Sequence, residues 1–154
     1  MKKLTALLVS LLILPSCATT SIFKEKIDLN QLLKAKNKID STDNAARQLL
    51  LKNDLTNKII VLNNIKVKDI ITSTNVDYDF CIISDIDSPE GKIEAYIYTK
   101  NIRALSRLNR GESVITVEGE FSRFFTMLDD YYVKIDIINS RIKAETTPPA
   151  DIKE

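Results

Sequence analysis

The sequence contains no histidine and no tryptophan, and it has only three glycines in 154 residues. Without histidine, the chain lacks the commonest general base and the commonest metal ligand. Gly91, Gly111 and Gly119 lie far apart, so they cannot form a phosphate-binding loop or a dinucleotide fingerprint. No serine lies in a Gly-x-Ser-x-Gly elbow. We therefore expect a protein that is not an enzyme and that carries no cofactor and no metal.

The chain also has little net charge. Lys and Arg number 22 against 21 Asp and Glu, which gives a formal charge of +1 at pH 7. Proteins that bind nucleic acid usually have a basic excess, because contacts to phosphate supply most of their affinity. The composition therefore argues against nucleic acid as a partner.

Long apolar runs are absent except at the N-terminus, where Leu4 to Leu14 follow Met1-Lys2-Lys3. This run is too short for a transmembrane helix, which needs about 20 residues, but it is typical of a secretory signal peptide. Leu14-Pro15-Ser16-Cys17 resembles the lipobox of bacterial lipoproteins, in which the cysteine becomes the acylated N-terminus and carries palmitate or a similar chain. A secreted protein or an uncleaved anchor is the alternative.

We accordingly expect a signal peptide over residues 1–16 and lipid attachment at Cys17. The protein would then be held in the bacterial cell envelope by its lipid, at the outer membrane or at the periplasmic face of a membrane. Residues 17–40 would contain a tether and a short helix.

Two helices are expected before the first strand. Asp28 is a suitable N-cap, and Leu29, Leu32 and Leu33 follow it at helical spacing. A second helix is predicted over about 42–53. Its N-cap candidates are Ser41, Thr42 and Asp43, and its apolar face consists of Ala45, Ala46, Leu49 and Leu50.

From Lys58 the apolar period changes from helical to alternating. The alternation predicts five strands, over about 58–67, 78–85, 93–98, 114–124 and 131–137. A helix with Ile102, Leu105 and Leu108 on one face separates the third strand from the fourth, and Gly111 ends it. Residues 144–154 are expected to form a disordered tail.

Three strands, a helix and two strands follow the order of the OB-fold, a five-stranded barrel. The strands of so small a barrel must bend sharply, and glycine or asparagine suits such bends. Asn63 in the first strand and Gly119 in the fourth occupy equivalent places in an apolar-x-Asn/Gly-x-apolar pattern. The prediction is a mainly β protein in which an OB-fold domain with a leading helix covers residues 41–143.

The run Arg110-Gly111-Glu112-Ser113-Val114-Ile115-Thr116-Val117-Glu118-Gly119 resembles the Lys-Gly-Asp-x-Val-x-Val-x-Gly motif of the tRNA-anti-like OB-fold family of bacterial envelope proteins. The predicted helix before the barrel matches that family too. Asn63 stands where the family has a glycine. The resemblance implies the OB-fold and an envelope lipoprotein, and it implies nothing about binding of tRNA.

OB-folds bind ligands on the face of strands two and three, between two loops. Here those loops are Thr72–Asp77 and Phe125–Asp130. Because Ile93, Ala95 and Ile97 form the inner set of the third strand, we expect its other side chains to face outward. The predicted binding residues are Tyr96, Tyr98, Arg123, Phe124 and Phe125. Alternatively, the tyrosines pack beneath the N-terminal helices, and one phenylalanine belongs to the core.

Two further groups have ordinary structural explanations. Asp85, Asp87 and Glu90 surround a turn but lack the spacing of a calcium loop. Cys81 lies among apolar residues of a strand, where a buried thiol is expected.

The sequence thus favours a non-catalytic binding module for an envelope protein or peptide. The alternative is binding of single-stranded nucleic acid or an oligosaccharide by the same face. A hydrolase that uses Asp79, Asp85 or the pair Asp129 and Asp130 is a third hypothesis.

Overall fold

A computed structural model describes residues 24–127 and 129–144 of the chain. The predicted signal peptide, Cys17 and the predicted tail from 145 onward lie outside the described residues. The strands are β1 (Lys26–Asp28), β2 (Ile59–Thr72), β3 (Phe80–Ser88), β4 (Gly91–Tyr98), β5 (Val114–Phe125) and β6 (Val133–Ala144). The helices are α1 (Leu29–Asp40), α2 (Ala45–Thr56) and α3 (Ile102–Leu105).

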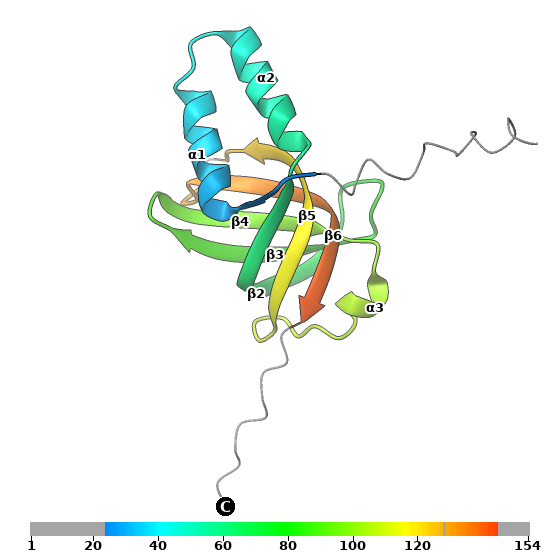
Figure 1. The fold of residues 1–154 in the computed structure, drawn as a ribbon. Helices are drawn as coiled ribbons and strands as arrows, with labels where there is room; N and C mark the ends of the chain where they lie inside the picture. The colour runs from blue at the N-terminus through cyan, green and yellow to red at the C-terminus, as the bar shows by residue number, and fades with distance from the viewer. Residues whose placement is uncertain (1–23, 128, 145–154) are drawn as a thin grey trace, which may run out of the picture.

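Strands β2 to β6 form a closed barrel, so the predicted mainly β, OB-fold-like architecture is confirmed. The strands pair in the order β2-β3-β4-β6-β5, and β5 returns to β2 to close the barrel (Figure 1). The β4–β6 pair is parallel, and the other pairs of the barrel are antiparallel. Strand β1 adds a short parallel edge beside β2, and this strand was not predicted from the sequence.

The register of the barrel strands shifts at several places, and two of these coincide with the residues singled out in the sequence. The pairing of β2 with β5 shifts between Leu62 and Ile65, and there Asn64, not Asn63, has a positive φ of 55°. Gly119 lies where the pairing of β5 with β6 shifts. A Cβ on Gly119 would lie 2.5 Å from Cγ2 of Ile137 and 3.0 Å from the carbonyl oxygen of Ile138. Gly119 is therefore required by close approach of β6.

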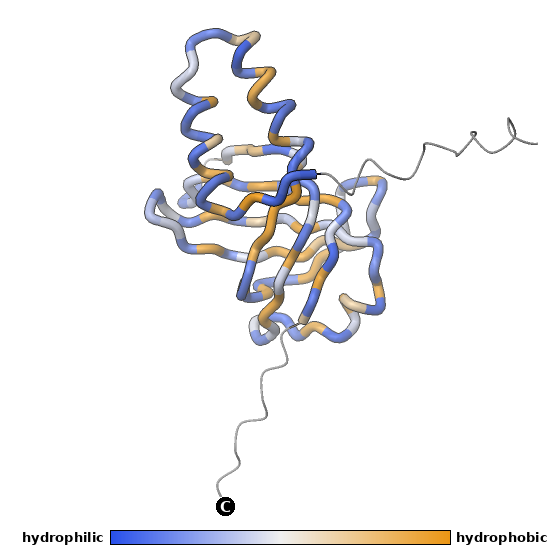
Figure 2. Tube along the Cα trace, viewed as in Figure 1, coloured by the Kyte–Doolittle hydropathy of each residue, from blue (hydrophilic) through white to orange (hydrophobic). Residues whose placement is uncertain are grey.

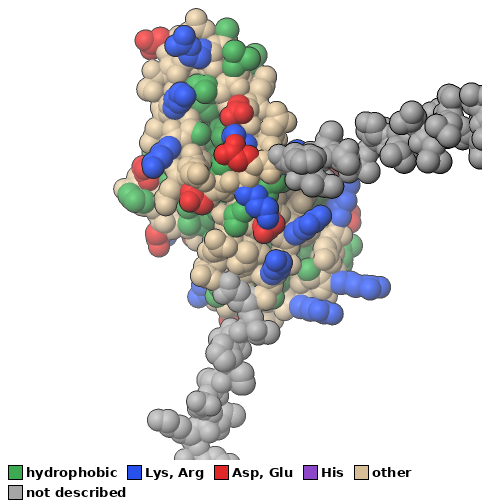
Figure 3. All heavy atoms as spheres, in the orientation of Figure 1, with side chains coloured by type: hydrophobic (Ala, Val, Ile, Leu, Met, Phe, Trp, Pro, Cys, Tyr) green, Lys and Arg blue, Asp and Glu red, His purple; other side chains and the backbone are tan. Residues whose placement is uncertain are grey.

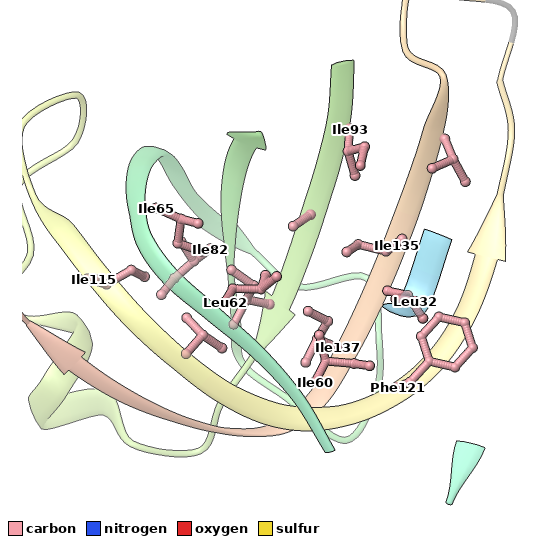
Figure 4. Packing of buried hydrophobic residues seen from close by; sticks show 14 of the residues in the cluster. Leu32, Ile60, Leu62, Ile65, Ile82, Ile93, Ile115, Phe121, Ile135 and Ile137 are labelled. Atoms are coloured by element: carbon pink, nitrogen blue, oxygen red, sulfur yellow. The ribbon is translucent and has the colours of Figure 1, made fainter. Parts of the chain in front are cut away.

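A single core connects the barrel with the two N-terminal helices. Figure 2 shows that hydrophobic residues run along the barrel strands, while the helical hairpin alternates hydrophobic and hydrophilic residues. Leu32 and Leu33 of α1 are nonetheless completely or almost completely buried. Leu32 extends toward Phe121 and Ile135 of the barrel (Figure 4). The boundary predicted between residues 40 and 41 therefore divides one packed unit.

The two helices differ from their predicted forms in detail. Asp28 caps α1 as expected, in a capping box with Gln31. Helix α2 is capped by Asn44 and begins later than predicted, and it continues to Thr56. The apolar face predicted for α2 does not pack, because Leu49 and Leu50 are 58% and 70% exposed.

The remaining differences concern the ends of strands. Tyr78 precedes β3 instead of belonging to it, and Ala144 completes β6 instead of starting a tail. No helix within residues 24–127 and 129–144 has the length and apolar character needed to cross a membrane.

Candidate binding site

The predicted binding surface is the outer face of β3 and β4. In the structure this face, together with β6, carries an ionic cluster. The cluster consists of Lys68, Asp85, Glu94, Asp129, Tyr131 and Lys134. Glu94 lies at its centre and is only 5% exposed. Its Oε2 accepts hydrogen bonds from Nζ of Lys134 at 2.8 Å and from the Tyr96 hydroxyl at 2.9 Å. Its Oε1 accepts from Nζ of Lys68 at 3.0 Å.

The cluster also fastens the loop between β5 and β6 to the barrel. Asp129 forms an ion pair of 2.5 Å with Lys134, and the Tyr131 hydroxyl donates to Asp85 at 2.9 Å. Burial alone would raise the pKa of Glu94, but the hydrogen bonds from Lys134, Lys68 and Tyr96 outweigh it and lower the pKa. The cluster therefore holds its charges in place at neutral pH.

Tyr98 lies on the outer face of β4 as predicted, but it is 6% exposed and unavailable to a ligand. It packs against Tyr78 of the β2–β3 loop, with the ring centroids 5.5 Å apart, and against Cys81. The Tyr78 hydroxyl donates to Oδ1 of Asn139 at 2.8 Å and so holds the loop down. The prediction of Tyr98 as a binding residue is wrong, because the loop covers it; the N-terminal helices do not.

Arg123 links the outer face to the end of β5. Its Nε donates to Oδ2 of buried Asp136 at 2.6 Å, yet 66% of the Arg123 side chain is exposed. The guanidinium carbon lies 5.3 Å from the centroid of the Phe125 ring. Phe125 in turn lies 5.6 Å from the Tyr96 ring. Three predicted residues, Tyr96, Arg123 and Phe125, are thus brought together.

Phe124 points to the opposite side of β5 and packs against Phe121 of the core, with ring centroids 4.6 Å apart. Phe124 is thus partly buried against the core, which favours the alternative interpretation of the two phenylalanines. Its partly buried ring still contributes to the wall of a groove.

That groove runs between the helical hairpin and the end of β5, and its cavity has a volume of about 400 Å³. Its apolar wall comes from Ile39, Phe121, Phe124 and Phe125. Its polar rim comes from Lys36, Asp40, Lys52, Thr56, Ser122, Arg123 and Thr126. Figure 1 shows the hairpin rising from the end of the barrel beside this part of β5.

The rim of the groove is basic. Nζ of Lys36 is paired with Asp40 at 2.6 Å and lies 4.8 Å from the Tyr132 ring centroid. Lys52 is exposed and forms no ion pair with any residue in the described part of the chain. With Arg123 exposed beyond its contact to Asp136, the rim offers more positive than negative charge. Such a groove suits an apolar side chain flanked by carboxylates.

Sequence reasoning missed Lys36 and Lys52 as members of the site. Both belong to predicted helices, but no local sequence pattern determines how the helical hairpin packs against β5. That placement depends on tertiary contacts, among them the hydrogen bond of 2.8 Å from the Tyr132 hydroxyl to Oδ1 of Asn37.

The acidic side chains and the thiol singled out in the sequence have structural surroundings. No group of three or more acidic or cysteine side chains in residues 24–127 and 129–144 could hold a metal ion. Asp85 belongs to the ionic cluster, and Asp129 is paired with Lys134. Burial raises the pKa of the Cys81 thiol to about 12, so the thiol is protonated and unreactive at neutral pH.

Comparison with known proteins adds no assignment: no family model matches the chain, and no curated protein matches it. The resemblance to the tRNA-anti-like family therefore stays a prediction. The fold and the groove are the observations from which a function must be inferred.

Proposed function

We propose that the chain is a non-catalytic lipoprotein of the bacterial cell envelope, anchored through acylated Cys17, which binds a peptide segment of another envelope protein. The observation that carries the proposal is the groove of about 400 Å³ between the helical hairpin and the end of β5. Its aromatic wall and basic rim select an apolar or aromatic side chain with acidic neighbours.

A peptide fits the groove better than a base or a sugar does. Stacking of bases or sugars needs exposed aromatic faces. Here Tyr98 is buried, Phe124 packs on the core, and Tyr96 is committed to Glu94 by its hydroxyl. Phe125 remains, with the Arg123 guanidinium over its ring. This leaves the groove with a wall for an apolar anchor and cations for carboxylates.

The proposal is tested by affinity purification of the full-length protein from detergent-solubilised membranes of its own cells. We expect one envelope protein to copurify in a stoichiometric amount. Lys52→Glu reverses a charge on the groove rim and is expected to abolish copurification. Arg47→Glu is the matched control, because Arg47 is exposed on the same helix and does not line the groove.

Two outcomes would contradict peptide binding. One is equal capture by the Lys52→Glu and Arg47→Glu variants. The other is retention of an oligosaccharide or a single-stranded oligonucleotide by the wild type and by Lys52→Glu alike, which would support the alternative ligand classes.

The anchor needs its own measurement. We expect the wild type to incorporate labelled palmitate and to partition into the detergent phase, and Cys17→Ser to do neither. If the wild type carries no labelled palmitate and partitions into the aqueous phase, the lipoprotein assignment is contradicted. Peptide binding by the groove would still be decided by the copurification experiment.

A further inference from the structure

A second surface, distinct from the groove, is rich in cations. The segment from Thr99 to Gly111 contains four basic residues and no acidic one, and β6 adds two more near its end. We define the basic surface by its members: Lys100, Arg103, Arg107, Arg110, Arg141 and Lys143. All six are exposed.

The fold brings the two parts of the basic surface together. The Thr99 hydroxyl donates to the carbonyl oxygen of Ser140 at 2.8 Å, which fixes the start of the segment beside β6. Lys100 and Asn139 line one open hollow, and Asn139 and Arg141 line the next. Figure 3 shows Lys and Arg side chains gathered on the lower right of the molecule, away from the helical hairpin.

The protein itself neutralises the cations of this surface only in part. Arg110 forms an ion pair of 3.3 Å with Asp69. The nearby carboxylates of Glu118 and Glu120 are paired with Lys26 and Lys24, and the charges of Lys143 and Arg141 also help to lower the pKa of Glu118. Lys100, Arg103 and Arg107 form no ion pair within the described residues.

The start of the described chain lies on the same side. Nζ of Lys24 pairs with Glu120 at 3.0 Å, and Glu120 accepts a hydrogen bond from Asn139, which borders both hollows. Cys17 precedes Lys24 by seven residues, which span at most about 25 Å when fully extended. A lipid on Cys17 therefore keeps the basic surface near the bilayer that holds the lipid.

We propose that the basic surface docks on the anionic phospholipid headgroups of that bilayer, with Arg103 and Arg107 as its principal contacts. Ile102, 51% exposed between these cations and Lys100, is placed to enter the headgroup region. Proteins that bind at the membrane interface combine cationic side chains, which attract anionic lipids, with apolar side chains, which enter the headgroup region. The proximity of this surface to a bilayer rests on the proposed lipid anchor at Cys17. The charge of the surface is independent of that anchor.

Docking in this manner sets the orientation of the proposed peptide site. The hairpin and the basic surface lie at different ends of the barrel (Figure 1). With the basic surface on the membrane, the groove between hairpin and β5 opens away from the lipid and faces partners in the aqueous compartment.

The first test measures cosedimentation of chain 18–154 with vesicles, without the lipid. Every core residue lies between Ile27 and Ile137, so this chain keeps the whole core. We expect binding to vesicles of phosphatidylglycerol and phosphatidylethanolamine in equal amounts, and none to phosphatidylcholine. Raising ionic strength from about 0.1 M to about 1 M shortens the Debye length from about 10 Å to about 3 Å and is expected to release the protein.

The variant R103Q/R107Q tests whether Arg103 and Arg107 bind the anionic headgroups. Each cation near an anionic surface strengthens binding about fivefold, so we expect an affinity loss of about 25-fold. The control K34Q/R47Q removes two exposed cations from the hairpin and is expected to change affinity less than about twofold, because the hairpin lies at the other end of the barrel (Figure 1) and salt screens distant charges. Thermal unfolding is expected to be unchanged in both variants.

The second test uses the full-length acylated protein in the same two vesicle compositions. We expect slower tryptic cleavage after Arg103 and Arg107 on anionic vesicles than on neutral ones. Equal binding to neutral vesicles, equal losses in the two double variants, or displacement by a single-stranded oligonucleotide at lower concentration than by anionic vesicles would each overturn the proposal. A chain that proves not to be acylated would contradict the anchor, and the first test would still decide the docking surface.

Discussion

The two surfaces that meet at Arg123 have opposite characters. On the outer face of β3, β4 and β6, Glu94 and Lys134 satisfy each other and the flanking loops are tied down by Tyr78 and Tyr131. In the groove beside the hairpin, Lys52 has no ionic partner among the described residues, and part of the aromatic wall is uncovered. The first surface has its charged groups paired internally. The second pairs Lys36 with Asp40 and Arg123 with Asp136 but leaves Lys52 without an ion pair among the described residues.

This difference shows that the position of a residue in a fold does not by itself identify a binding site. The OB-fold places recognition on the outer face between two loops, and the sequence does put tyrosines there. A loop that folds over a tyrosine converts it from a contact residue into a core residue. The following variants test whether the two surfaces differ as strongly as their contacts indicate.

Tyr98→Ala is expected to have the largest effect. Removing this buried ring leaves a cavity beside Tyr78 and Cys81, and we expect the free energy of unfolding to fall by about 4 kcal/mol. Urea denaturation measures the loss. Tyr98→Phe keeps the ring and serves as the control. Normal stability of Tyr98→Ala combined with loss of partner capture would make the outer face the binding site and reverse the comparison.

Glu94→Ala is expected to cost about 3 kcal/mol, because it leaves the ammonium of Lys134 largely buried with Asp129 as its remaining partner. The double variant Glu94→Ala/Lys134→Met removes both charges, and we expect it to recover much of the loss. If the single and double variants are equally unstable, the ionic cluster contributes through packing instead of charge.

Acid is expected to weaken the outer face specifically. The folded-state pKa of Glu94 is lowered from its ordinary value of 4.5, so its carboxylate stabilises the fold above that pH. This contribution is lost as the pH falls through the lowered pKa of the folded state. We expect the melting temperature of wild type to drop more steeply below pH 4.5 than that of Glu94→Gln. Parallel curves would show that other carboxylates dominate acid unfolding.

Lys52→Ala is expected to have the smallest effect on stability, within about 0.5 kcal/mol, because the side chain is exposed and unpaired within the described chain. Its effect on capture of the envelope partner is expected to be large. Chemical denaturation and copurification of the same preparation separate the two quantities. A loss of stability comparable to that of Glu94→Ala would mean that Lys52 makes stabilising contacts within the protein and is not free to bind a partner.

The sequence predicted what depends on local pattern. Alternation gave the five barrel strands and their order, and Asp28 caps α1 as expected. Gly111 does not end α3, because that helix stops at Leu105 with Ser106 as its C-cap. It also predicted that Tyr96 lies outside the inner set of Ile93, Ala95 and Ile97, which are all completely buried.

What failed depends on contacts between distant segments. Leu49 and Leu50 look like a packing face on α2, but the hairpin approaches the barrel so that Leu55 is buried instead. Asn63 matched the position of a family glycine, but the pairing with β5 places the positive φ at Asn64. Tyr98 is covered by a loop whose course no periodicity describes.

The closure of the barrel by β2 and β5 has a consequence for the rate of folding. Ile59 pairs with Glu120, so the first and fourth barrel strands must meet across most of the domain before the core is complete. Pairing of strands that are distant in sequence costs loop-closure entropy before the new contacts compensate for that cost. Two-state folding with such pairing therefore takes about milliseconds to seconds. The hairpin α1–α2 can form sooner from local contacts, but Leu32 and Leu33 find their full burial only when the barrel is closed. Until then the edges of β2 and β5 are open to pairing with other chains, so refolding at high protein concentration competes with aggregation.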